Sequence, residues 1–131
     1  MSFKAGDILS FTAHDATFGM AKVLRIDTLE DLPTPEPVLH LLIYSVRNIF
    51  PPNLAHLAEA KPFIAHLPLF ESAVVKSGCV HIGYQEVRAD ELDAYRVWQD
   101  AFFSGEAGIF NLPISEAIGI ILEALGKKSK L

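Results

Sequence analysis

The hydrophobic pattern of the chain centres on one apolar run, Val38 to Val46. Three prolines within residues 33–37 precede the run, and two prolines at residues 51–52 follow it. Its length and its valine, isoleucine and tyrosine content favour a β-strand over a helix. Apolar side chains fall on both alternations of this strand: Val38, Leu42, Tyr44 and Val46 on one, and Leu39, Leu41 and Ile43 on the other. A strand that is apolar on both faces must be covered on both faces.

The segments before this run predict a β-hairpin. Residues 8–13 alternate apolar and polar side chains, and in residues 18–27 Leu24 and Ile26 alternate with Lys22, Arg25 and Asp27. The alternation breaks at residues 20–23, where side chains on both faces of the strand would be apolar. This break predicts a β-bulge or a strong bend. About four residues join the two segments, so we expect them to pair as antiparallel strands.

The segments after the run predict only short elements of secondary structure. Residues 53–60 predict one or two helical turns with Asn53 as the N-cap. Residues 63–70, interrupted by Pro68, predict a loop or an edge segment. Residues 73–75 predict a short strand, and residues 79–84 predict another.

Two amphipathic helices complete the pattern. The first covers about residues 90–103, with Asp90 as its cap and an apolar stripe that includes Tyr95 and Trp98. The second covers about residues 113–125. It opens at Pro113, a position that proline tolerates, and it has the cleanest apolar periodicity in the chain.

Strands first and helices last predict an α+β fold in a single domain, residues 1–131. We expect a small bent antiparallel sheet, an SH3-like half barrel, over about residues 7–84. Two C-terminal helices pack on it, and a basic tail follows at residues 127–131. We expect the two helices together to cover the second face of the central strand, because the hairpin contributes to its other face.

Composition narrows the class of protein. Half of the residues are hydrophobic and the mean hydropathy is +0.29, which leaves apolar surface for a partner, most simply a second copy in a homodimer. The net charge is −5, which argues against nucleic acid or an anionic membrane and is compatible with a basic protein partner. A nucleic-acid-binding module would need Lys4, Lys22, Arg25 and Arg47 on one face.

The single cysteine, Cys79, excludes an internal disulfide and a cysteine-based zinc site. The first residues contain no apolar stretch of the signal-peptide type, and no apolar run approaches the length of a membrane span. These features predict a cytoplasmic protein with no membrane partner. Phosphate-binding glycine loops and the serine nucleophile elbow do not occur, and the five histidines lack metal-site spacing, so we expect no cofactor and no metal.

One candidate site is acidic. Glu86, Asp90, Glu91 and Asp93 lie within eight residues, and Arg88 is the only base among them. Acidic side chains at a helix start are favoured by the helix dipole, which is the structural explanation. The functional alternative is an acidic patch that binds a basic partner.

A second candidate is a polar site of His14, Asp15, His40 and His81. His14 and Asp15 adjoin at the expected hairpin tip, where they can form an acid–base pair. Turn preference explains Asp15 equally well, and His40 within the central strand is most simply a core histidine.

Two patches of the sequence resemble a known family. Gly6-Asp7-Ile8-Leu9 followed by residues 18–24 is similar to the opening hairpin of the bacterial polymorphic-toxin immunity proteins classed as immunity protein 26. Residues 78–83, Glu91-Leu92 and residues 95–98 resemble the distal part of that family. The resemblance covers about a third of the chain, and its motifs are largely structural. It implies a cytoplasmic α+β protein that neutralises a toxin by binding it, with no catalytic motif.

Three hypotheses follow. The first is a non-enzymatic binding protein, of the toxin-immunity kind, that covers a site on its partner. The second is a small enzyme with a His/Asp-based site. The third is a homodimeric structural module of unknown function. Convergence of the histidines with carboxylates in one pocket would favour the enzyme, whereas their dispersal would disfavour it.

Overall fold

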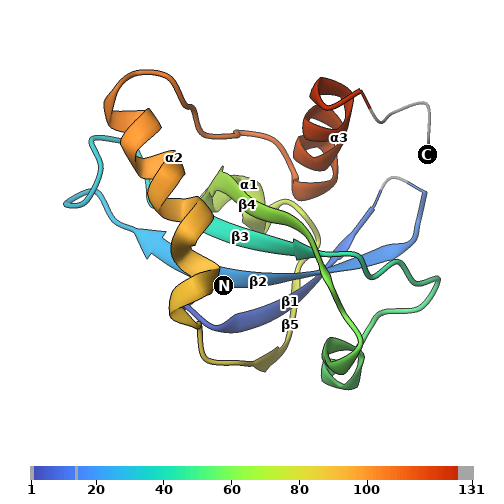
Figure 1. The fold of residues 1–131 in the computed structure, drawn as a ribbon. Coiled ribbons are helices and arrows are strands. Elements are labelled where there is room, and N and C mark those ends of the chain that lie inside the picture. The colour runs from blue at the N-terminus through green and yellow to red at the C-terminus, as the bar shows by residue number, and fades with distance from the viewer. Residues whose placement is uncertain (1, 14, 127–131) are drawn as a thin grey trace.

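Five strands form one antiparallel sheet at the centre of the computed structural model, which describes residues 2–13 and 15–126 (Figure 1). The strands are β1 (Asp7–Thr12), β2 (Phe18–Asp27), β3 (Val38–Tyr44), β4 (Pro62–Phe70) and β5 (Val80–Tyr84). Their order in the sheet is β4-β3-β2-β1-β5, so the strand predicted to organise the fold lies between β2 and β4. The first two strands pair as the predicted hairpin, with Phe11 opposite Gly19.

Within the described residues, three α-helices and two short 3₁₀-helices surround the sheet. They are η1 (Leu54–Ala58), α1 (Glu71–Val75), η2 (Ala89–Leu92), α2 (Asp93–Phe103) and α3 (Ile114–Ala124). The predicted α+β class and both C-terminal helices are confirmed, and Asn53 caps η1 as expected. The predicted cap Asp90 is wrong, because Asp90 lies within η2 and the N-cap of α2 is Leu92. The SH3-like half barrel stays a prediction, and the basic tail at residues 127–131 lies outside the described residues.

Residues 73–75 are helical, so the predicted short strand there is wrong. Val74 is fully buried and Val75 is half exposed in α1, a difference that a strand would also show, so the hydrophobic pattern did not distinguish the two elements. Residues 63–70 lie in the edge strand β4, which agrees with the edge-segment alternative, and Pro62 and Pro68 both belong to this strand. Proline is tolerated there because β4 is an outer strand of the sheet.

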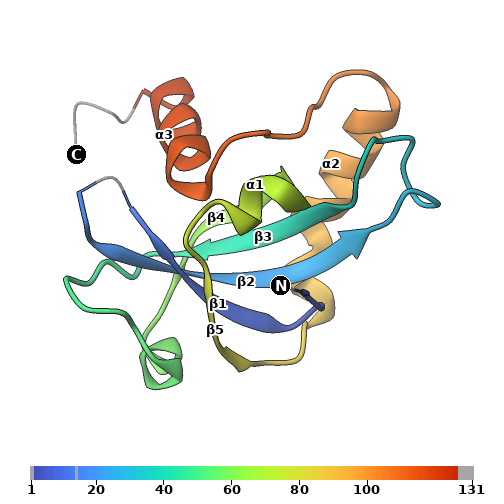
Figure 2. The ribbon, with the colours of Figure 1, turned by 180° about the vertical axis from the view of Figure 1, so that it is seen from behind.

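The two long helices cover opposite faces of β3, which corrects the expectation that they share one face. Leu39, Leu41 and Ile43 belong to a core cluster with Ile114 and Ala117 of α3. Val38, on the other alternation, belongs to a cluster with Tyr95 and Trp98 of α2. Figures 1 and 2 show α2 and α3 well apart, at opposite ends of the sheet. The central strand is therefore covered on both faces, as its two apolar alternations predicted.

A β-bulge in β2 decides which side chains face α2. The register between β2 and β3 shifts between Val23 and Arg25, which makes Leu24 the extra residue. Beyond the bulge, Ile26 packs against the α3-side cluster, whereas Leu24 packs in a cluster on the opposite face. The prediction that Leu24 and Ile26 share one face is therefore wrong. After a bulge, each later side chain of the strand points to the face opposite to the one that simple alternation predicts. Arg25 and Asp27 are directed to the α2 face as a result.

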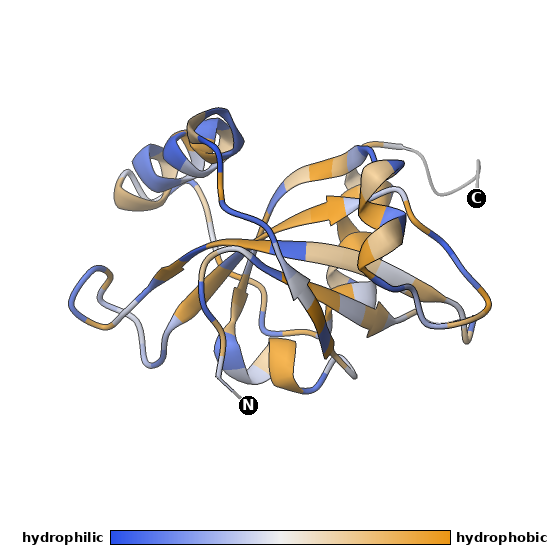
Figure 3. Ribbon diagram, turned by 90° about the horizontal axis from the view of Figure 1, so that it is seen from below, coloured by the Kyte–Doolittle hydropathy of each residue, from blue (hydrophilic) through white to orange (hydrophobic). Residues whose placement is uncertain are grey.

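The distribution of polarity follows these layers (Figure 3). The strands are mostly hydrophobic, and α2 is hydrophilic over much of its length. Four acidic or basic side chains are nevertheless nearly or fully buried in β1, β2 and β3: Asp7, Lys22, Asp27 and His40. Buried polar groups need hydrogen-bond partners, so these residues mark the positions of specific polar contacts inside the protein.

Candidate functional site

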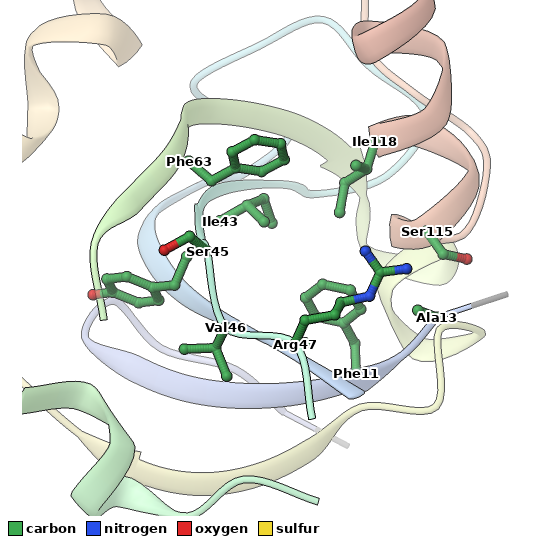
Figure 4. A pocket seen from close by; sticks show the side chains of 11 residues that line it. Phe11, Ala13, Ile43, Ser45, Val46, Arg47, Phe63, Ser115 and Ile118 are labelled. Carbon is green, nitrogen blue, oxygen red and sulfur yellow. The ribbon is translucent and has the colours of Figure 1, made fainter. Parts of the chain in front are cut away.

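An apolar pocket opens between the ends of the central strands and α3 (Figure 4). We call it the α3 pocket. Its volume is about 180 Å³. The lining residues come from β1, the β1–β2 connection, β2, β3, the β3–β4 connection, β4 and α3: Phe11, Ala13, Gly19, Ile43, Tyr44, Ser45, Val46, Arg47, Phe63, Ser115 and Ile118. A methyl group at Gly19 would overlap the ring of Phe11, so glycine at this position lets that ring form a wall of the pocket.

Arg47 is the one charged side chain among these lining residues. It extends toward α3, where Ser115 and Ile118 lie, and Phe63 lies across the pocket (Figure 4). Arg47 Nε donates to Thr17 Oγ1 at 2.8 Å, and Arg47 Nη2 donates to Asp15 Oδ2 at 3.2 Å. The hairpin tip thus holds the guanidinium at the edge of an apolar cavity.

A second polar arrangement lies buried under α2, centred on the carboxylate of Asp27. Arg25 Nε donates to Asp27 Oδ1 at 2.8 Å, and the hydroxyl of Tyr95 donates to both oxygens at 3.0 and 3.1 Å. His40 Nε2 lies 2.9 Å from Asp27 Oδ2, and His40 Nδ1 lies 2.7 Å from Nε2 of His66. Asp27 and His40 side chains are fully buried, and His66 is partly buried.

These contacts assign the histidine tautomers. Because the Asp27 carboxylate accepts, His40 donates from Nε2, which leaves its Nδ1 to accept a hydrogen bond from His66 Nε2. His66 then has a lone pair on Nδ1. In the described part of the chain, every buried side-chain nitrogen or oxygen has a hydrogen-bond partner. His66 Nδ1 has no partner among these residues, so this atom is not buried and can reach solvent.

Burial keeps both imidazoles neutral. Loss of solvent lowers the pKa of His40 to about 4, even though the Asp27 carboxylate opposes this shift. Loss of solvent, together with the neighbouring His40, lowers the pKa of His66 to about 3. The pKa of Tyr95 rises to about 12, first through burial and then through its hydrogen bond to Asp27. The arrangement resembles a proton relay from Asp27 to a solvent-facing nitrogen.

The acidic segment is turned partly inward. Glu91 Oε1 accepts from Lys22 Nζ at 2.9 Å, and the Glu91 side chain is only 6% exposed. Of the other acids, Asp90 pairs with Arg88 at 3.1 Å and Asp93 pairs with Arg96 at 3.4 Å. Both of these pairs lie at the surface, and Glu86 is exposed. The four predicted acids therefore do not form a uniform acidic face.

The predicted polar site is dispersed. His14 lies outside the described residues, and Asp15 is exposed at the hairpin tip, bonded to Arg47. His40 belongs to the buried Asp27 network, and His81 pairs with Asp7 at 3.0 Å on the β1–β5 side of the sheet. His40, His81 and Asp15 thus belong to three separate sets of contacts.

Sequence reasoning did not bring together the residues that form the α3 pocket or those that form the buried network around Asp27. Asp27 looked like one of the polar positions of a half-exposed strand, but the bulge at Leu24 turns it inward. His66 meets His40 because β3 and β4 pair with a bulge between Ile64 and Leu67. The available signal was the aspartate at the end of β2, since strands are depleted in aspartate.

The basic residues required for a nucleic-acid surface do not gather. Lys22 is fully buried, Arg25 is bonded to Asp27, and Arg47 lies at the hairpin tip with Asp15. Lysine buried in this way cannot contact a phosphate backbone. Within the described ranges, no three histidine, cysteine, aspartate or glutamate side chains are placed to hold a metal ion.

Comparison of the chain with family profiles, with curated proteins and with solved structures found no match. None of the helices formed by residues 2–13 and 15–126 has the length and apolarity needed to cross a membrane.

Proposed function

We propose that this protein is a non-enzymatic binding protein that contacts a protein partner at the α3 pocket and covers a site on that partner. The single observation that supports this most strongly is the size and setting of the pocket. Its volume of about 180 Å³ is smaller than the roughly 300–1,000 Å³ of usual small-molecule sites. It is close to the size of a cavity that holds one benzene ring, and so suits one apolar side chain of a partner.

The surroundings of the pocket support a protein partner. Phe63 lines the pocket and is 46% exposed. Ile49 and Phe50 follow Arg47 closely in the chain and are 74% and 73% exposed. Large apolar side chains that stay exposed beside a pocket are typical of protein interfaces, where an anchor inserts and the rim excludes water.

The resemblance to toxin-immunity proteins agrees with this kind of function, since such proteins act by binding. The net charge of −5 favours a basic partner over long distances, whereas the pocket governs the close contact. The acidic residues at 86–93 contribute to that long-range attraction rather than to the anchor site in this proposal.

Co-purification tests the proposal. The full chain is co-expressed with the product of the adjacent reading frame, the natural place for a toxin gene. Ala13→Phe, which fills the pocket from the hairpin side, is compared with Ala89→Phe, an exposed alanine in η2. We expect the wild type and Ala89→Phe to retain the partner and Ala13→Phe to lose it, with unchanged circular dichroism. Equal retention by all three would place the contact elsewhere, and failure of the neighbouring product to bind or be inhibited would remove the main support.

One observation favours a second candidate, an enzyme that uses His66 as a base. The chain of contacts from Asp27 through His40 leaves His66 Nδ1 as a solvent-facing acceptor. His66 lines neither of the two pockets described in the structure, and no nucleophile adjoins it there. We therefore rank this candidate second; a hydrolase or transferase activity abolished by His66→Gln would reverse the order.

A further inference from the structure

The α3 pocket has unused hydrogen-bond donors at its edge. A guanidinium has five N–H groups. Arg47 uses two of them among the described residues, one toward Thr17 and one toward Asp15. Three N–H groups therefore remain available among the described residues, two on Nη1 and one on Nη2, and the Arg47 side chain is 59% exposed. A ligand group in the pocket can reach these donors without breaking an existing contact.

The hairpin tip keeps the guanidinium in place. Hydrogen bonds from Thr17, and then the charge of Arg47, lower the pKa of Asp15 to about 2. Asp15 is consequently a carboxylate throughout the neutral range and remains a partner for Arg47. The arginine is thus anchored on one side and open on the other.

Resting on the proposed function, we infer that the partner segment entering the α3 pocket presents an apolar side chain with a carboxylate beside it, and that Arg47 binds this carboxylate. The apolar group packs on Phe11, Ile43 and Phe63, which line the cavity. Charge complementarity identifies the polar group, because the planar guanidinium matches a carboxylate with two parallel hydrogen bonds. A lysine or arginine of the partner at this point is repelled by Arg47.

The same chemistry could come from a protein or from a small aromatic acid. The size of the cavity favours the protein segment, as does Phe63, a half-exposed lining residue that extends the apolar contact beyond the cavity. The partner group is therefore an aromatic or large aliphatic residue next to aspartate or glutamate.

Two capped peptides test the inference. The acetylated and amidated peptides Gly-Asp-Phe-Gly and Gly-Asn-Phe-Gly are titrated into the full chain, and amide shifts of the pocket residues are followed by NMR. We expect the aspartate peptide to bind about five-fold more tightly, the effect of one partly exposed ion pair. The preference should disappear in Arg47→Gln and persist in part in Arg47→Lys.

Arg96→Gln is the matched control. Arg96 is 58% exposed and pairs with Asp93, much as Arg47 is 59% exposed and pairs with Asp15. We expect this variant to keep the wild-type preference. If Arg47→Gln does not fold, Arg47→Lys and the salt dependence of the wild-type preference replace it, since an ion pair weakens as salt rises.

Each remaining outcome contradicts a defined step. Equal binding of both peptides, a preference that survives in Arg47→Gln, or a preference insensitive to salt overturns the role of Arg47 and leaves pocket binding intact. Binding of 3-phenylpropionate without binding of either peptide overturns the protein source. Absence of pocket shifts with all three probes overturns both the inference and the proposed anchor site.

Discussion

The ammonium group of Lys22 lies 2.9 Å from a carboxylate oxygen of Glu91, with the Lys22 side chain fully buried and that of Glu91 only 6% exposed. Two further acceptors, Gln85 Oε1 at 3.0 Å and the carbonyl of Glu86 at 2.9 Å, complete the three hydrogen bonds that an ammonium can donate. This single lysine of β2 therefore connects the sheet to the segment that precedes α2. The acidic sequence at residues 86–93 is positioned by an inward contact, which its composition alone would not suggest.

Replacing Lys22 by methionine is expected to destabilise the protein by about 3–5 kcal/mol, because it leaves the Glu91 carboxylate largely buried without its main partner. The double variant Lys22→Met/Glu91→Leu should recover much of this loss, since two apolar side chains need no partner. Urea denaturation followed by circular dichroism measures both changes. Arg96→Met, which removes a surface ion pair, is the control and should change the free energy of unfolding by less than about 1 kcal/mol. A double variant no more stable than Lys22→Met would contradict this account of the pair.

Asp27→Asn is expected to cost about 3 kcal/mol of unfolding free energy. The side chain keeps its shape, but one acceptor oxygen must now serve the Arg25, His40 and Tyr95 donors that the carboxylate served with two. Tyr95→Phe removes one donor and leaves the carboxylate with its other partners, so it should cost about 1 kcal/mol. Denaturant midpoints of the two variants give this ranking directly. A larger loss for Tyr95→Phe than for Asp27→Asn would place the stabilising contact in the α2 packing rather than in the carboxylate.

The bulge at Leu24 marks the limit of sequence-based inference for this chain. The central strand with its two apolar faces, the hairpin and the amphipathic helices follow from local periodicity, and each of them is present in the structure, although β3 ends at Tyr44 and not at Val46. The break in alternation near Val23 indicated a bulge, but its position decides on which face Asp27 lies. An error of one residue exchanges the two faces of a strand, because the side-chain period is two.

The candidate sites were harder to predict, because their residues meet through long-range pairing. His40 and His66 belong to strands whose register includes a bulge, and Arg47 meets Asp15 only when the hairpin tip folds beside the end of β3. Charge patterning placed Glu91 in an exposed patch, whereas its partner Lys22 lies 69 positions away. Such contacts depend on tertiary packing and have no local signature.

Cys79 is expected to resist alkylation in the folded protein. The thiol is buried, with the residue 7% exposed, and burial raises its pKa to about 12, so little thiolate exists at pH 8. Iodoacetamide at that pH should label the urea-unfolded chain and leave the native chain unmodified, as measured by intact mass. Labelling of the native protein at the unfolded rate would show that the residues around Cys79 open readily.

Stability is expected to fall as the pH decreases from about 6.5 toward 4, because of His40 and His66. The pKa values of these rings in the folded protein are about 4 and about 3, below the ordinary value of 6.5. As the pH drops through 6.5, the unfolded chain takes up protons that the folded chain does not, so acid favours unfolding. At pH 5 each ring should reduce the unfolding free energy by about 2 kcal/mol relative to pH 7.5. Urea titrations at a series of pH values measure this dependence of the unfolding free energy on pH.

His66→Gln removes one of the two groups and should reduce the slope of that dependence by about half. An unaltered slope in His66→Gln would mean that other groups govern the acid sensitivity and that the buried pair does not.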